Sequence, residues 1–208
     1  MSRLTIAALA ATACLSWSGA HADEVTTKTF NLAPETKFLN CFAANPAKPP
    51  TATVTVSRAG QRDHLVLTVT GLKPHLHFDA FTVQRSNLLA NGTPDPAFTN
   101  FGLAWYQSDL NADENDAATT SLNSIFIDQI FGFDPDVSLA PSNTFHIGFW
   151  FNNPNTAGPC GFNAALPTPF NGEHKAGPAA MISVPNENTG LGPLCLNPFA
   201  ASPTGCNN

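Results

Sequence analysis

The sequence predicts an all-β protein, namely an antiparallel two-sheet β-sandwich of immunoglobulin-like or dismutase-like type. Short segments of alternating apolar and polar residues recur between turn residues, and helical periodicity is scarce. The chain has 208 residues, a length at which all-β proteins still fold as one domain. Charged residues make up only 12% of it, which is typical of exported proteins built of strands and polar loops.

The expected strands follow one another along the chain with turns or loops between them. Residues 51–57 are rich in β-branched side chains, which favour strands. In residues 144–152, the most apolar segment, four large side chains fall on one face, which we take as the core face: Phe145, Ile147, Phe149 and Phe151. The full set of expected strands is 51–57, 64–70, 75–84, 101–109, 118–128, 144–152 and 179–184.

The N-terminus predicts a cleaved signal peptide over residues 1–22. Arg3 supplies the positive charge, residues 4–13 form an apolar run too short to span a bilayer, and Ala20-His21-Ala22 is a small-x-small cleavage site. A buried N-terminal helix and a lipoprotein signal ending at Cys14 are the alternatives. Cleavage leaves one domain over residues 23–208, which we expect in the periplasm or outside the cell. Residues 153–208 hold nine of the 18 prolines and are expected to be loop-rich.

Four cysteines remain after cleavage, and an even number in an exported chain predicts two disulfides. They are Cys41, Cys160, Cys195 and Cys206, which allow three connectivities. We expect Cys41 to pair with Cys160, and Cys195 with Cys206, so that the bridges hold the loop-rich C-terminal region. A zinc–thiolate site is disfavoured because no CxxC spacing occurs.

The charge pattern excludes some classes of partner. The formal net charge is −6 and no basic cluster is present, which disfavours nucleic acid and anionic membranes as partners. After the first apolar run no second one is long enough for a transmembrane segment.

Histidines are the most distinctive candidates for chemistry. His75 and His77 are two positions apart in an expected strand, so their imidazoles should share one face, together with Asp79. His146 lies on the face of its strand opposite the phenylalanines, where Gly148 leaves room, and His174 lies in a glycine-rich loop. These side chains predict a copper or zinc site formed by His75, His77 and either His146 or His174, with Asp79 as a further ligand or support. The alternative is that each imidazole is simply solvated.

Other kinds of site are less well supported. Asp109, Asn111, Asp113 and Asn115 alternate as in a calcium loop, but Glu114 stands where glycine is needed, so a solvated turn is favoured. No GxSxG elbow is present. A pair of carboxylates for glycoside hydrolysis needs no local motif and stays open.

Two resemblances add to this interpretation. Residues 71–79, Gly-Leu-Lys-Pro-His-Leu-His-Phe-Asp, resemble the turn and His-rich strand of copper–zinc superoxide dismutases and of chordin-type (CHRD) domains. Those domains are exported β-sandwiches, but a dismutase-like dinuclear site uses more histidines than this mature chain has, which implies at most a mononuclear site. Residues 101–109, 145–154 and 168–177 are similar to secreted bacterial proteins without an assigned activity, which implies export and a β architecture.

We therefore expect a secreted or periplasmic, non-enzymatic β-sandwich protein that acts as a binding or envelope-associated structural module. Two alternatives stay open. One is a periplasmic copper- or zinc-binding protein that uses His75, His77 and a third histidine. The other is a secreted hydrolase whose carboxylate pair the sequence does not place.

Overall fold

The computed structural model describes residues 26–59, 62–124, 139, 142, 144–165 and 176–195, and antiparallel strands dominate these ranges. The strands are β1 (Thr26–Pro34), β2 (Thr51–Ala59), β3 (Arg62–Thr70), β4 (His77–Val83), β5 (Ala104–Asn111), β6 (Ala117–Ser124), β7 (Thr144–Phe151), β8 (Ala179–Ile182) and β9 (Leu194–Cys195). The helices are short: η1 (Thr36–Phe38), α1 (Leu39–Phe42) and η3 (Pro154–Cys160). The mostly antiparallel β architecture predicted from the sequence is confirmed. The expected signal peptide, His174 and Cys206 lie outside the described residues.

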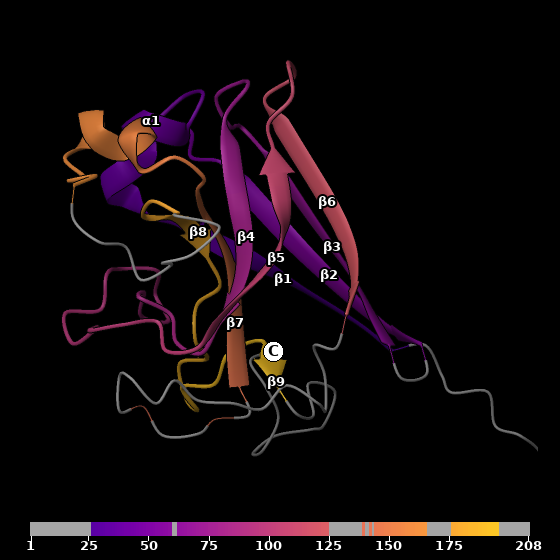
Figure 1. Cartoon of the computed structure of the whole chain (residues 1–208). Helices are drawn as coiled ribbons and strands as arrows, with labels where there is room; N and C mark the ends of the chain where they lie inside the picture. Colours follow the sequence, from indigo (N-terminus) through magenta and orange to yellow (C-terminus); the bar gives the residue numbers. More distant parts are fainter. Residues whose placement is uncertain are drawn as a thin grey trace, which may run out of the picture.

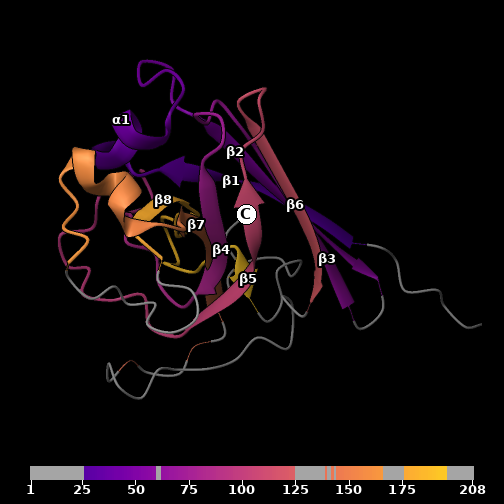
Figure 2. The same cartoon turned by 45° about the horizontal axis from the view of Figure 1, so that its top comes forward.

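Eight strands form one continuous hydrogen-bonded path, in the order β5-β4-β7-β8-β1-β2-β3-β6, and β9 pairs with β7. β1 joins the two halves of this path, because its residues 26–32 pair with β2 and its last two residues pair with β8. The end strands β5 and β6 lie side by side (Figures 1 and 2), and the Ser108 Oγ and Thr120 Oγ1 atoms are 2.7 Å apart. The sheet is thus curled and nearly closed. The expected division into two separate sheets is not confirmed, since β1 belongs to both halves.

The main hydrophobic core fills the inside of the curled sheet. β3 shows why: its residues alternate strictly, and Leu65, Leu67 and Val69 point inward with no exposed surface. The face of β7 predicted as core packs against them from the other half of the sheet, and Phe78 of β4 joins it, 5.1 Å from Phe149 between ring centroids. Sequence alternation therefore places the core correctly.

A second, smaller core lies on the outer face of the β4–β7–β8 half. β4 and β7 are buried on both faces apart from their first residues, as expected for strands covered on either side. Phe81 and Trp150 point outward from them, with ring centroids 5.5 Å apart. Leu88 and Phe101, from the loop between β4 and β5, cover these rings. The loop over residues 84–103 is thus packed onto the sheet, and this packing positions the candidate site.

One pair of cysteines ties the short helices together. α1 and η3 lie side by side at one end of the sheet (Figure 1). Cys41 of α1 and Cys160 of η3 have their Sγ atoms 2.07 Å apart, at bonding distance, across 119 positions of sequence. This is the first pair that the sequence led us to expect. None of the helices in the described part of the chain has the length and apolar character needed to cross a lipid bilayer.

Candidate functional site

The two histidines of the His-x-His pattern lie at the start of β4, but only one belongs to the strand. β4 begins at His77, and His75 precedes it with a φ of 60°, in the left-handed region. The shared face predicted by strand alternation therefore does not extend to His75. Both imidazoles are exposed, and His77 Nδ1 lies 2.6 Å from Asn111 Oδ1 on β5.

His146 lies at the other end of β4 from these two residues. In the register of β4 and β7, His146 faces Val83, the last residue of β4, six positions after His77. At a rise of about 3.3 Å per residue, about 20 Å separates the two levels. The structure therefore does not bring His146 to the His-x-His pair. The version of the metal site with His174 as third ligand lies outside the described residues and stays a prediction.

Asp79 is buried in the sheet rather than presented to a metal ion. Its side chain has no exposed surface, and its Oδ1 accepts a hydrogen bond from Asn152 Nδ2 at 2.9 Å. Across the described ranges, no three His, Cys, Asp or Glu side chains are placed so that they could hold one metal ion. Asp79 is therefore not supported as a ligand beside His77.

Two carboxylates in the described sheet, Asp79 and Asp109, are direct neighbours across β4 and β5. Asp109 accepts a hydrogen bond from the Tyr106 hydroxyl at 2.8 Å. Loss of solvation and then the neighbouring Asp109 raise the pKa of Tyr106 to about 12. A glycosidase needs two carboxyl groups that face each other across an open cleft. Full burial of Asp79 leaves no such cleft here.

The alternating acidic turn between β5 and β6 uses its main carboxylate to close the turn. Asp113 Oδ1 accepts backbone hydrogen bonds from Ala117 at 3.0 Å and Asn115 at 2.8 Å. These bonds lower the pKa of Asp113, because they stabilise the ionised carboxylate. The turn carries the chain from one half of the sheet to the other, since β5 pairs with β4 and β6 with β3. Asp113 thus stabilises the connection between β5 and β6.

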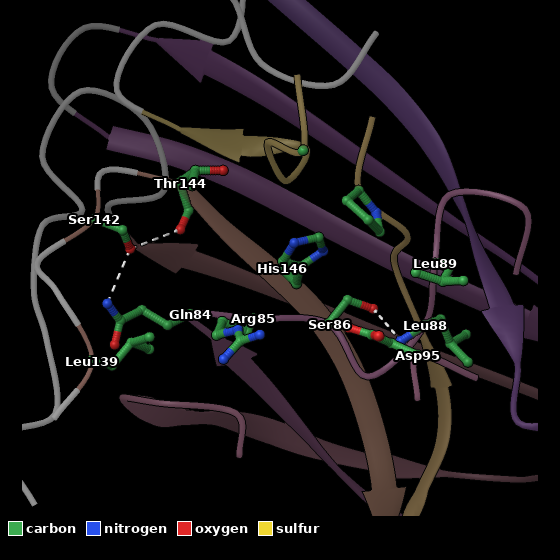
Figure 3. Close-up of a pocket in the computed structure, with 12 residues that line it drawn as sticks. Gln84, Arg85, Ser86, Leu88, Leu89, Asp95, Leu139, Ser142, Thr144 and His146 are labelled. Carbon is green, nitrogen blue, oxygen red and sulfur yellow. Dashed lines mark hydrogen bonds between the residues drawn. The ribbon is translucent and has the colours of Figure 1, made fainter. Parts of the chain in front are cut away.

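A pocket of about 280 Å³ opens at the end of β4 and β7 where His146 lies (Figure 3). Its walls come from four parts of the chain. The start of β7 supplies Thr144 and His146, and the segment after β8 supplies Pro185 and Gly190. The loop after β4 supplies Gln84, Arg85, Ser86, Leu88, Leu89 and Asp95. Leu139 and Ser142 complete the lining. The fold thus brings together residues that lie up to about a hundred positions apart in the sequence.

A second hollow continues the first. It has a volume of about 410 Å³ and shares Leu89, Pro185 and Gly190 with the pocket. Leu89 is 40% exposed, one of the two large apolar side chains that the described surface presents most openly. Together the two hollows form a groove between the loop after β4 and the segment after β8.

His146 is held as a neutral imidazole in the wall of this pocket. Only 3% of the residue is exposed, and Nδ1 lies 2.9 Å from the Ser183 carbonyl oxygen. A carbonyl oxygen only accepts, so Nδ1 carries the proton and donates it, which leaves Nε2 as an unprotonated acceptor. Burial lowers the pKa of His146 to about 4, against the opposing effect of the Ser183 hydrogen bond. The imidazole is therefore uncharged at neutral pH.

The space expected beside His146 is not open. A Cβ added to Gly148 would come within 2.6 Å of the Met181 carbonyl oxygen and 3.0 Å of Ile182 side-chain carbons. β8 packs against β7 at this point, so the glycine permits close approach of two strands rather than a metal or a ligand.

Two charged side chains face the same pocket from the loop after β4. Arg85 and Asp95 are both half-buried and both line it. The Asp95 amide donates to the Asn87 carbonyl oxygen at 2.9 Å, and Leu88 pairs with Pro94 across the same hairpin. Asp95 therefore lies directly across the hairpin from Asn87, and Asn87 follows Arg85 by two positions in the sequence.

The Ser183 and Ser86 hydroxyl groups near His146 form hydrogen bonds other than one to its Nε2 atom. In the described ranges, no hydroxyl group is hydrogen-bonded to His146 Nε2, as a serine nucleophile and its base require. Ser183 Oγ is buried and accepts from the Ile147 amide at 3.2 Å. Ser86 Oγ accepts from the Leu88 amide at 3.1 Å, which leaves its proton for a partner in the pocket.

Of these pocket residues, His146 was predicted from the sequence as a candidate site residue, whereas Arg85, Ser86 and Asp95 were not. The available signal was the length of the segment between β4 and β5, because long loops on a rigid sheet frequently carry function. Its prolines and glycine marked it only as irregular.

Comparison of the chain with protein-family models, with curated proteins and with solved structures finds no match. The resemblances to dismutase, chordin-type and secreted bacterial proteins therefore stay predictions, and the site is interpreted from its own geometry.

Proposed function

We propose that this protein is an exported, non-enzymatic binding module that takes a small polar ligand in the pocket beside His146. The observation that carries the proposal is the placement of polar groups there. A neutral imidazole acceptor, the Ser86 hydroxyl, a guanidinium and a carboxylate line one pocket. Three further polar side chains line it as well, Gln84, Ser142 and Thr144, and the rest of the lining is apolar apart from Gly190. Concave sites with an apolar lining and a few fixed polar groups are the usual form of small-ligand sites.

Export is part of the same proposal. The signal-peptide pattern of residues 1–22 and the Cys41 and Cys160 sulfur atoms at bonding distance both favour an oxidising compartment, the periplasm or the outside of the cell. We also propose that the two halves of the curled sheet pack face to face like the two sheets of a β-sandwich, because one continuous core lies between them.

Nuclear magnetic resonance of the mature chain tests the binding proposal. A library of small amides, alcohols, carboxylates and amines is added to isotopically labelled protein, and amide shifts are followed. We expect shifts concentrated at residues 85–95, 144–146 and 185–192. Absence of any such cluster, or a cluster on another face, contradicts the proposal.

Two matched variants sharpen this test. Leu89→Trp should fill part of the groove and abolish or weaken the shifts, because Leu89 lines both hollows. Tyr106→Trp is the control, since Tyr106 is the other openly exposed large apolar residue, at 39% exposure, and lines neither hollow. Equal loss of binding in both variants would indicate a general effect on the fold.

A copper or zinc site at the start of β4 is a second candidate, favoured by one observation. His77 Nδ1 lies 2.6 Å from Asn111 Oδ1, and an amide oxygen accepts, so Nδ1 donates and Nε2 is left free toward solvent. Metal-binding histidines are commonly oriented in this manner. Exposed His75 is the neighbouring ligand, and His174 is the third in this proposal.

Calorimetric titration of the mature chain with Cu²⁺ and Zn²⁺ tests this candidate. We expect one-to-one binding that is lost in the His75→Ala, His77→Ala double variant. His64→Ala is a matched control, because His64 is also exposed and its Nδ1 lies 3.0 Å from Asn123 Oδ1. Absence of stoichiometric binding, or equal loss on changing His64, rules out the site.

A further inference from the structure

We infer that the ligand of the pocket beside His146 is a compact zwitterion, of which a free α-amino acid is the simplest, with its carboxylate on Arg85 and its ammonium on Asp95. This inference rests on the proposed function and specifies its ligand class. It follows from the signs, the placement and the bonding of the side chains that line the pocket.

Two opposite charges line one pocket without neutralising each other. Arg85 and Asp95 are both half-buried, and both are described by the structure, but no ion pair joins them. They lie on the two arms of one hairpin, which backbone hydrogen bonds fix: the Leu89 amide donates to the Thr93 carbonyl oxygen at 2.8 Å, and the Asp95 amide donates to the Asn87 carbonyl oxygen. Because the hairpin backbone is held by these bonds, Arg85 and Asp95 can contact one molecule that carries both a negative and a positive charge.

The bonding of the two side chains leaves capacity for such a molecule. Asp95 Oδ1 accepts from the Ala97 amide at 2.8 Å, an Asx turn that holds the carboxylate and occupies one of its oxygens. In the described ranges, Oδ2 and the Arg85 guanidinium form no hydrogen bond to protein. A guanidinium binds a carboxylate through two parallel hydrogen bonds, and a carboxylate oxygen accepts well from an ammonium group.

The neutral groups of the pocket fit the rest of a zwitterion. Ser86 can donate its proton toward a carboxylate, since its oxygen already accepts from Leu88. His146 Nε2 is an acceptor for an ammonium hydrogen, and its lack of charge avoids repulsion of that group. Leu88, Leu89 and Pro185 form an apolar wall for a side chain. A ligand with a single charge would leave either Arg85 or Asp95 desolvated without a counter-charge, which costs affinity.

A matched series of probes tests the inference on the mature chain. L-alanine carries both charges, N-acetyl-L-alanine lacks the ammonium, and L-alaninamide lacks the carboxylate. Dissociation constants come from nuclear magnetic resonance titration of the pocket amides. We expect L-alanine to bind at least about tenfold tighter than either derivative, because each charge-assisted contact contributes roughly a factor of ten to a hundred.

Two variants assign the contacts separately. In Arg85→Gln the affinity for L-alanine should fall by about 10- to 100-fold and become similar to that for L-alaninamide. In Asp95→Asn it should fall by a similar factor and become similar to that for N-acetyl-L-alanine. Arg62→Gln, which changes an exposed arginine at the start of β3, is the control and should leave all three affinities unchanged.

The outcomes separate this inference from the proposed function. If either derivative binds as tightly as L-alanine, or if the variants do not change the ranking, the zwitterion is overturned and the pocket remains a polar-ligand site. If small amides and alcohols shift the pocket amides while glycine, L-alanine and L-leucine do not, the zwitterion is again overturned. If no probe of any kind shifts these amides, both proposals fall.

Discussion

Replacement of His146 by asparagine should remove a large part of the acid sensitivity of this protein. The asparagine amide can still donate to the Ser183 carbonyl oxygen, but it does not titrate. Burial lowers the pKa of His146 from 6.5 to about 4 in the folded chain. The unfolded chain therefore takes up the proton first as the pH falls. Stability that is fully present above pH 6.5 is lost progressively as the pH falls toward about 4.

The size of the effect follows from the shift. Each pKa unit corresponds to about 1.4 kcal/mol, so the full contribution is about 3 kcal/mol, of which about 2 kcal/mol is lost between pH 7 and pH 5. Urea unfolding followed by tryptophan fluorescence at these two pH values measures it. The wild-type free energy of unfolding should fall by about 2 kcal/mol more than that of His146→Asn.

A second histidine variant controls for the loss of an imidazole at another site. His77→Gln, which removes an exposed imidazole from the same half of the sheet, is the matched control for loss of a histidine. The reasoning is wrong if His146→Asn and wild type lose the same free energy between pH 7 and pH 5 to within about 0.5 kcal/mol.

Three further outcomes are expected. Paired Cys41→Ala and Cys160→Ala changes should lower the free energy of unfolding by about 3–5 kcal/mol, because the proposed bridge between these cysteines would close a long loop; a urea midpoint unaffected by them or by reductant would contradict this. Gly148→Ala should cost about 1–3 kcal/mol by collision with the β8 backbone, whereas Gly158→Ala, with open space around it, should be neutral; equal melting temperatures would refute the packing argument. Burial raises the pKa of Glu35, so the folded chain favours the protonated carboxyl group and loses stability as the pH rises and this group ionises. The melting temperature of Glu35→Gln, measured relative to wild type, should therefore be higher at about pH 8 than at about pH 4; the same difference at both pH values would contradict this.

The strands were predictable from sequence where alternation is regular, and the exceptions have physical causes. The expected segments 51–57 and 64–70 became β2 and β3 with small shifts of their ends. β1 was missed because Lys28 occupies an inward position, beside apolar Phe30 and Leu32, and interrupts the pattern. Partial burial lowers the pKa of this lysine to about 8, which shows the cost of the exception.

The candidate site was only partly predictable. Alternation along β7 correctly placed His146 on the face opposite Phe145, and the histidine does line a pocket. Its partners were wrong because the register between β4 and β7 decides which ends meet, and a single sequence does not contain that register. Arg85 and Asp95 line the same pocket as the histidine only because a loop packs onto the sheet, and a loop has no periodic signal in the sequence.

The near closure of the sheet also bears on strand pairing between separate copies of the chain. A strand at the margin of a sheet presents unpaired amides and carbonyls on which further chains can polymerise. Here the two marginal strands, β5 and β6, shield each other, since the Ser108 and Thr120 hydroxyls touch at 2.7 Å and leave no width for an intruding strand at that level. We therefore expect this arrangement to hinder the addition of a strand from another copy of the chain at that level of the sheet.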